Sequence, residues 1–191
     1  MALLYAVAMT VIPLLLAPIL IIGASLNRWH LRQRLQATPE LSGPASTPLT
    51  WFHAASVGEV VGLIVLVEAF RKEHPNERIV VSTATATGLA RVTEDLGDIH
   101  GAFLLPFDVP VLMRHLLRHL QPVRLILVEG ELWPSLLNAC KRHSCPVYVL
   151  NARMSDRSYP RNRWGKGLFK SMLSKIDVSG AQPRLDADRY I

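Results

Sequence analysis

The sequence predicts an α/β protein with a doubly wound parallel sheet, preceded by an N-terminal membrane-anchor helix. After residue 48, short apolar strand-like segments alternate with longer helix-like segments, and strands that alternate with helices form a parallel sheet. The fourth strand-like segment is apolar throughout, as a centrally buried parallel strand should be. The first charged side chain of the chain is Arg28, so the preceding segment is apolar enough to enter a membrane.

Residues 1–27 are expected to form an uncleaved anchor. Ala2–Asn27 carries no charge, and at about 1.5 Å per residue it can cross a hydrocarbon core of about 30 Å. Pro13 and Pro18 would kink this helix, which membrane helices tolerate. A cleaved signal peptide is the alternative, but such peptides have positive residues before a shorter apolar run. The positive-inside rule places the rest of the chain in the cytoplasm, because the anchor is followed by Arg28, Arg32 and Arg34.

Residues 28–48 are expected to be a linker. Its first part is basic, and residues 36–48 are rich in Pro, Ser, Thr and Gly, a composition typical of loops. We therefore expect the folded domain to cover residues 49–191.

The alternating pattern defines the elements of this domain. Runs of apolar, β-branched and aromatic residues predict the strands Leu49–Ala54, Arg78–Ser82, Ala102–Leu105, Leu125–Val128, Pro146–Leu150 and Val178–Gly180. Apolar stripes at helical spacing predict the helices Val60–Phe70, Leu89–Leu96, Val109–Leu120 and Trp133–Arg142, and one or two helices within Ser158–Lys175.

The first strand and helix organise the domain. Their sequence is Trp51-Phe-His-Ala-Ala-Ser-Val-Gly-Glu59, followed at once by the apolar run Val60–Phe70. Gly58 adopts backbone angles that other residues resist, so we expect the chain to reverse there. Open α/β sheets bind ligands outside the carboxyl ends of their strands. Glu59 is therefore predicted to lie where ligands bind.

Polar clusters follow four of the predicted strands. They are Glu59, the turn Thr83–Gly88, the pair Glu129 and Glu131, and Asn151-Ala-Arg153. Because the carboxyl ends of parallel strands share one edge of the sheet, we expect the clusters to converge on one cleft. A single glutamate could instead be a solvated first-turn residue favoured by the helix dipole. The turn Thr83–Gly88 could bind an anion through backbone N–H groups at a helix start.

Motifs for metals and nucleotide cofactors are missing. No Gly-x-Gly-x-x-Gly follows the first strand, and the turn Thr83–Gly88 lacks a Gly-Lys-Ser/Thr ending, which disfavours a dinucleotide cofactor and a nucleotide-binding regulator. His53 has no metal-ligand spacing to another His or Cys, so a satisfied buried histidine is the simpler interpretation. Cys140 and Cys145 have no second pair elsewhere, which favours reduced cytosolic thiols over zinc ligands. The sequence indicates neither a metal nor a cofactor.

Charge and hydropathy indicate acidic or membrane partners. The formal net charge of the 191 residues is +6, half of them are hydrophobic, and the mean hydropathy is +0.23. Residues 153–175 mix Arg and Lys with Tyr159, Trp164 and Phe169, a combination that suits nucleic acid or an anionic membrane. Given the anchor, a membrane or a phosphorylated lipid is favoured over nucleic acid, and a solvated helix face is the alternative.

Several motifs follow one another in a characteristic order. They are His53-Ala-Ala-Ser-Val-Gly-Glu59, Thr83-Ala-Thr-Ala-Thr-Gly88, Pro106-Phe-Asp108, Glu129-Gly-Glu-Leu-Trp-Pro134, Asn151-Ala-Arg-Met-Ser155 with Arg157-Ser158, and Ala181-Gln182 with Asp188-Arg189. The series resembles the amino-terminal half of the 3-deoxy-D-manno-octulosonic acid (Kdo) transferases of lipopolysaccharide assembly, from the anchor to the last residue.

The resemblance implies a GT-B glycosyltransferase, made of two Rossmann-like halves and anchored at the cytoplasmic face of the inner membrane. It implies transfer of Kdo from CMP-Kdo to the phosphorylated lipid A precursor (lipid IVA) by a metal-independent, inverting reaction. Glu59 falls on the family's catalytic base and Glu131 on its second important glutamate. The matched motifs also carry the residues expected to bind substrate: His53, Ser56, Gly58, Thr83, Thr85, Thr87, Glu129, Trp133, Asn151, Arg153, Ser155 and Arg157.

The chain departs from the family pattern at several points. Gly130 replaces the usual threonine, Ser135 replaces the usual asparagine after Trp-Pro, and Arg28–Leu35 matches the family's basic segment only weakly. The carboxy-terminal half that binds CMP-Kdo is expected to be absent. The rival hypothesis is a non-enzymatic, membrane-anchored module that binds lipid A and lacks a donor site.

Overall fold

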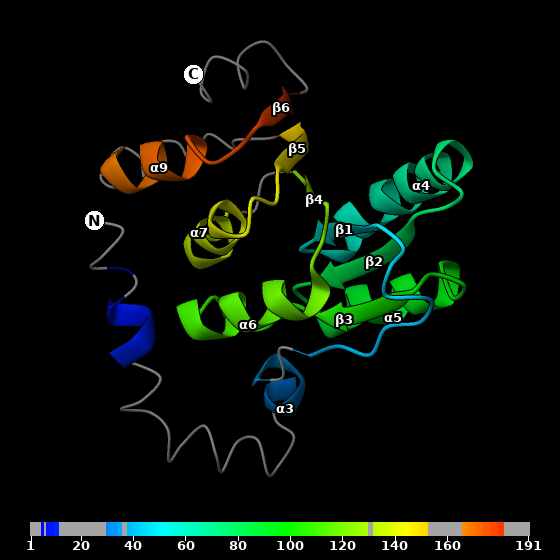
Figure 1. Cartoon of the computed structure of the whole chain (residues 1–191), viewed down its shortest axis with the longest axis horizontal. Helices are drawn as coiled ribbons and strands as arrows, with labels where there is room; N and C mark the ends of the chain where they lie inside the picture. The colour runs from blue at the N-terminus through cyan, green and yellow to red at the C-terminus, as the bar shows by residue number, and fades with distance from the viewer. Residues whose placement is uncertain are drawn as a thin grey trace.

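The computed structural model describes residues 5, 7–11, 30–35, 38–129, 132–152 and 166–181. In these residues six strands form one sheet, and every neighbouring pair is parallel (Figure 1). The strands are β1 (Leu49–Ala54), β2 (Arg78–Thr83), β3 (Gly101–Leu104), β4 (Arg124–Val128), β5 (Val147–Ala152) and β6 (Val178–Ala181). The predicted parallel α/β sheet is confirmed.

The order of the strands is β3-β2-β1-β4-β5-β6. The chain adds β2 and β3 on one side of β1, then returns to place β4 on the other side. Beyond the carboxyl ends of β1 and β4 the two connections therefore leave in opposite directions. Such a topological switch point is where open α/β sheets bind their ligands.

Helices cover both faces of the sheet. One layer consists of α4 (Val57–Glu73) and α5 (Ala86–Asp95), and the other contains α6 (Pro110–Leu120) and α7 (Pro134–Arg142). Met172 of α9 (Lys166–Leu173) packs against the α6/α7 core. Figure 1 shows α9 beside α7 and the short helix α3 (Leu31–Leu35) below β3.

Strand β1 joins the two cores because both of its faces are buried. Trp51 packs in the α6/α7 core and Phe52 in the α4/α5 core, as expected for side chains that alternate along a strand. Both are fully buried, and burial of such a side chain contributes about 1.5–3 kcal/mol. This two-sided burial explains why the strand is almost continuously hydrophobic in sequence.

The segment expected to be a linker differs from that expectation. It contains α3, in which Leu31 is 2% exposed. Farther along, Ser42 N–H donates to His100 O (2.8 Å), and Arg78 Nε–H donates to Thr47 O (3.1 Å). A Cβ on Gly101 would lie only 2.9 Å from the carbonyl oxygen of Glu40. The segment therefore covers the edge of β3, and such cover protects an edge strand from pairing with other chains.

The start of α4 also differs from the expected turn. Helix α4 begins at Val57, so Ser56 is its N-cap and Gly58 belongs to its first turn. Among the described glycines only Gly43 has a positive φ, and a Cβ on Gly58 would meet nothing closer than Ser56 Oγ at 3.9 Å. The expected chain reversal at Gly58 is therefore wrong, because the strand leads directly into the helix.

Two predicted positions move into regular structure. Thr83 is the last residue of β2 and Asn151 lies inside β5, whereas both residues were expected to follow their strands. Helix α9 lies within the range Ser158–Lys175, of which residues 158–165 fall outside the described residues. The other strand boundaries agree with the prediction to within one or two residues.

The predicted anchor falls largely outside the described residues, which include only residues 5 and 7–11 of it. Among the helices of the described part, none combines the length and the apolar character needed to cross a bilayer.

Candidate functional site

The carboxyl ends of β1 and β4 are neighbours in the sheet, with Phe52 opposite Ile126 and His53 opposite Leu127. Residues 55–59, which include the first turn of α4, and the segment after β4, which begins at Glu129, therefore start side by side at the switch point. These two segments carry Glu59 and Glu129, two of the glutamates that the sequence predicts to converge.

Glu59 is held at the start of α4 by both of its carboxylate oxygens. Its Oε2 accepts from Ala55 N–H (2.6 Å) and its Oε1 from Ser56 Oγ–H (3.0 Å). Glu59 N–H donates to Ser56 Oγ (3.4 Å) in return, so the two side chains form a reciprocal cap of the capping-box kind. Each carboxylate oxygen has two lone pairs. The partly exposed carboxylate therefore keeps capacity to accept from a ligand.

Glu129 and Asn151 form a second part of the edge. Asn151 Nδ2–H donates to Glu129 Oε1 (3.2 Å), and Glu129 N–H donates to Leu150 O (2.9 Å). Both residues have left-handed backbones, with φ of 65° at Glu129 and 57° at Asn151. A left-handed backbone at a residue other than glycine costs about 1–3 kcal/mol and is concentrated at functional sites. The end of β4 is thus fixed in an unusual conformation.

The threonine turn is used for the start of α5. Thr85 Oγ1 accepts from Gly88 N–H (3.1 Å), which makes Thr85 the N-cap of α5. Buried Thr83 donates from its hydroxyl to Thr85 O (3.0 Å). Thr85 also donates to Ala55 O (3.5 Å), which links this turn to the loop after β1. Thr85 and Thr87 are exposed at the edge, whereas the Thr83 side chain is enclosed.

His53 lies directly beneath these loops and is fully buried. Its Nδ1 is 3.1 Å from Ser82 O and 2.9 Å from Ser82 Oγ, while Trp51 Nε1–H donates to the same hydroxyl (2.8 Å). A carbonyl oxygen can only accept, so we assign the ring proton to Nδ1 and leave Nε2 as an acceptor. Burial lowers the pKa of His53 to about 4, so the ring is neutral at pH 7.

Two buried nitrogens at this edge have no partner within the described residues. They are His53 Nε2, an acceptor, and Trp133 Nε1, a donor. Trp133 is the N-cap of α7 and ends the loop that follows β4. Unpaired buried polar atoms are rare, and water or a ligand is a common reason for them. The position of these atoms is consistent with their predicted role in substrate binding.

Two residues that reach this edge were not predicted as site residues. Arg34 of α3 donates from Nη1 to Leu105 O (3.3 Å) and from Nη2 to Ala84 O, so it joins the ends of β3 and β2. Asp108 is 3% exposed and accepts from the N–H groups of Ser135 and Leu136. The motif Pro106-Phe-Asp108 and the basic residues before the domain were the only sequence signals for them.

Some predicted site residues lie outside the described part of the chain. These are Glu131, Arg153, Ser155 and Arg157. In the described part, no three or more His, Cys, Asp or Glu side chains form a group that could hold a metal ion.

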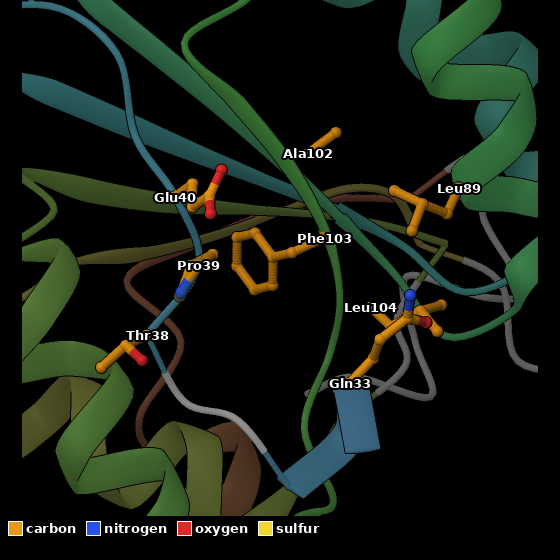
Figure 2. A pocket seen from close by; sticks show the side chains of 8 residues that line it. All are labelled: Gln33, Thr38, Pro39, Glu40, Leu89, Ala102, Phe103 and Leu104. Atoms are coloured by element: carbon orange, nitrogen blue, oxygen red, sulfur yellow. The ribbon is translucent and has the colours of Figure 1, made fainter. Parts of the chain in front are cut away.

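A pocket of about 380 Å³ lies away from the switch point, against the outer side of β3. Figure 2 shows Phe103 facing Pro39, with Gln33 of α3 and Leu89 of α5 closing the sides. None of the predicted site residues lines this pocket, so it is not the predicted cleft.

Comparison with known proteins decides the family. The family model described as 3-deoxy-D-manno-octulosonic-acid transferase (kdotransferase) matches residues 29–191. The chain belongs to the Kdo transferase family. It is 34% identical over 181 residues to the 3-deoxy-D-manno-octulosonic acid transferase of Haemophilus influenzae, which covers 93% of this chain and 42% of that protein.

Two other curated proteins are similar to this chain over most of its length. The Chlamydia trachomatis serovar D protein is 32% identical over 172 residues, which covers 88% of this chain and 39% of that protein. A bifunctional glycosyltransferase/methyltransferase of Fusobacterium nucleatum is 35% identical over 143 residues, 74% of this chain and 22% of that protein. The chain thus spans about two fifths of the length of the first curated relatives that it matches.

One solved structure agrees in fold. It is a protein assigned as a UDP-N-acetylglucosamine 2-epimerase from Listeria monocytogenes, with a TM-score of 0.55 and 11% identity. The likeness covers 76% of this chain and 42% of the epimerase, and at this identity it supports only the Rossmann-like fold.

Proposed function

We propose that this chain is the acceptor-binding half of a GT-B type Kdo transferase, with Glu59 as catalytic base. The complete enzyme would move Kdo from CMP-Kdo to a hydroxyl of the lipid A precursor in lipopolysaccharide core biosynthesis. The donor site would lie in a carboxy-terminal half.

One observation carries this proposal: in a member of this family, the loops with Glu59 and Glu129 start from adjacent strands at the switch point. Ligands of open α/β sheets bind outside such a point. The acceptor hydroxyl would approach Glu59 from this side, with Ser56, Glu129, Trp133 and Asn151 around it. Glu131 is proposed as the second important glutamate of the reaction.

The chemistry explains why carboxylates suit this edge. A sugar nucleotide loses its phosphate through a cationic, oxocarbenium-like transition state, and a carboxylate opposite the leaving group can take the proton of the attacking hydroxyl. Glu59 lies in the first turn of α4, where the helix dipole interacts favourably with a carboxylate. Its hydrogen bonds to Ala55 and Ser56 hold the carboxylate in one orientation.

The surroundings proposed for the enzyme follow from charge and hydropathy. The apolar N-terminal segment would anchor the chain at the cytoplasmic face of the inner membrane. The basic residues 153–175, with Arg153 and Arg157, would face the phosphates of the lipid. The proposed reaction is inverting and needs no metal.

A second candidate function is a membrane-anchored module that binds lipid A without transferring sugar. The observation that favours it is the capping role of Glu59, because the bonds to Ala55 and Ser56 are sufficient reason for a glutamate at that position. Capping would persist in a protein that had lost transfer.

The deciding experiment is Kdo transfer from CMP-Kdo to a tetra-acylated lipid A precursor, in detergent and without added metal. We expect no product from these 191 residues alone and product when a carboxy-terminal half of a family member is added. Product from the chain alone would contradict the half-enzyme assignment. If neither mixture gives product while the precursor still binds, the binding module is supported.

A further inference from the structure

We propose that Asp108 is a positioning residue for Trp133, which it holds by fixing the first turn of α7. This inference rests on the proposed function where it concerns transfer, but the structural part can be measured without any activity. Asp108 ends the motif Pro106-Phe-Asp108, to which the proposed mechanism gives no role.

The start of α7 has no cap of its own. Its N-cap residue is Trp133, which makes no side-chain cap bond, and Pro134 at the first helical position has no N–H to donate. The next two N–H groups, of Ser135 and Leu136, both donate to Asp108, each at 2.9 Å. A buried carboxylate 27 residues earlier in the chain thus satisfies the first turn, which otherwise leaves its donors unpaired.

Fixing this turn also fixes Trp133, the N-cap residue of α7. Trp133 directly precedes the turn that Asp108 binds. Strand β4, from which the chain comes, ends at Val128 and is held in the sheet by β1 and β5. A displacement of the α7 start would therefore move Trp133 relative to the sheet and to Glu59.

The segment that carries Asp108 is itself attached on its other side. Phe107 N–H donates to Arg34 O (3.2 Å), and the Arg34 guanidinium lies over the Phe107 ring at 5.5 Å from its centroid. Tyr5 O–H donates to Asp108 Oδ2 (2.8 Å). The carboxylate is thus bound by Tyr5 as well as by α7, and the preceding residue, Phe107, is held by α3.

Burial makes the Asp108 carboxylate an energetically unfavourable helix cap. Burial raises the pKa of this carboxyl above its ordinary value, although the hydrogen bonds from Ser135, Tyr5 and Leu136 lower it. A folded-state pKa above the unfolded one means that the ionised form lowers stability at neutral pH. A serine or threonine at the N-cap position would cap α7 without this cost. The remote, buried carboxylate is better explained by the position that it imposes.

The test compares Asp108→Asn with two controls in the full chain. Asn keeps the shape of Asp but presents an N–H2 group to one of the two helix donors. Asp98→Asn removes an exposed carboxylate that pairs with Arg71 on the far edge of the sheet. Tyr5→Phe removes only the Tyr5 hydrogen bond and leaves both α7 bonds intact.

The first measurement is hydrogen exchange of individual backbone amides. Loss of one charged hydrogen bond should accelerate exchange at the amides of Ser135, Leu136 and Leu137 about tenfold in Asp108→Asn, with little change in the strand amides. Asp98→Asn and Tyr5→Phe should leave these residues as in the wild type. Unchanged exchange in Asp108→Asn, an equal increase across the sheet, or the same local increase in Tyr5→Phe would overturn the proposal.

The second measurement uses the reconstituted transferase. Asp108→Asn should lower kcat at least tenfold while KM for the acceptor changes less than twofold. A normal kcat, or a change in KM alone, would contradict positioning. Failure of the wild type to transfer Kdo would instead count against the proposed function and leave the exchange result to decide this inference. If Asp108→Asn does not fold, Asp108→Glu provides the same comparison with a displaced carboxylate, and wild-type exchange in it would overturn the proposal.

Discussion

Glu77 at the amino edge of the sheet has different partners from Glu59 and Asp108 at the carboxyl edge. At the amino edge, Glu77 accepts from Thr50 Oγ1–H (2.6 Å) and lies 3.3 Å from both Arg124 Nη2 and His74 Nδ1. At the carboxyl edge, Glu59 and Asp108 accept from N–H and O–H groups. Within the described residues neither of them forms an ion pair.

The difference separates structural charge from charge that is available for chemistry. At the amino edge the cationic side chain of Arg124 neutralises the carboxylate of Glu77, so little of the field of this carboxylate reaches a ligand. At the carboxyl edge neutral donors orient the carboxylates and leave their negative charge in place. Oriented, uncompensated charge is the arrangement that stabilises a cationic transition state.

The largest effect is expected for Glu59→Gln. The amide keeps the size of the side chain but cannot accept a proton, so Kdo transfer by the reconstituted enzyme should fall by roughly 10²–10⁴-fold. Binding of the lipid acceptor, measured by equilibrium titration, should be retained.

Glu73→Gln is the matched control, because Glu73 ends the same helix at the opposite edge and is exposed. It should transfer Kdo at the wild-type rate. Near-normal turnover by Glu59→Gln would show that Glu59 is not the catalytic base. Glu59 and the control residue Glu73 would then not differ in function.

The next largest effect is expected in the pH dependence of the free energy of unfolding, through His53. Its folded pKa of about 4 lies below the ordinary 6.5, so the unfolded chain binds more protons between these values. Stability should therefore be complete above pH 6.5 and fall as the pH drops toward 4, by on the order of 3 kcal/mol. Urea unfolding at several pH values measures this loss. His53→Gln, which does not titrate, should show a shallower decline, and an identical decline would show that the buried ring has no such role.

Glu77→Ala should affect stability alone. The side chain is 14% exposed and pairs with Arg124, and it also accepts from Thr50. Removing it leaves Thr50 and Arg124 without their acceptor, which should cost about 2–3 kcal/mol in the free energy of unfolding. Denaturant titration checks the loss, and Kdo transfer measured at low temperature should stay normal. Loss of Kdo transfer in a Glu77→Ala protein that is still folded would show that Glu77 contributes to activity as well as to stability.

The smallest effect is expected at Asn151. Asn151→Gly keeps a residue that tolerates the positive φ but removes the bond to Glu129, whereas Asn151→Ala also adds backbone strain. We expect Ala to be less stable than Gly by about 1 kcal/mol, and both to transfer Kdo more slowly because Glu129 loses the hydrogen bond from Asn151. Equal stability of the two variants would show that the left-handed backbone contributes no strain.

Local patterns in the sequence were sufficient to predict the strands of the sheet. The run around Trp51 and Phe52 is hydrophobic because both faces of β1 are buried, and a strand of that kind is visible in a few consecutive residues. The placement of Glu59 and Glu129 at the same edge of the sheet was predictable from topology, since parallel strands share their carboxyl edge. Ser56 and Glu59, three residues apart, already had the spacing of a capping box.

Long-range contacts explain what local patterns missed. The edge cover by residues 38–48 depends on a close approach between Glu40 and Gly101, which no local composition reveals. The capping role of Asp108 required knowing that α7 begins beside the segment between β3 and α6. The turn at Gly58 was wrong for a different reason, because glycine permits reversal without requiring it.

The attachment of residues 31–48 to the domain changes the reach of the proposed enzyme. If all of residues 28–48 were free, the domain could stand about 75 Å from the end of the anchor, at about 3.6 Å per residue. Because Leu31 is buried, the free distance from the proposed anchor at Asn27 is at most about 15 Å. Arg34 then joins this short tether to the ends of β2 and β3. The edge that carries Glu59 would thus stay close to the bilayer, and the search for a lipid substrate would become a two-dimensional one.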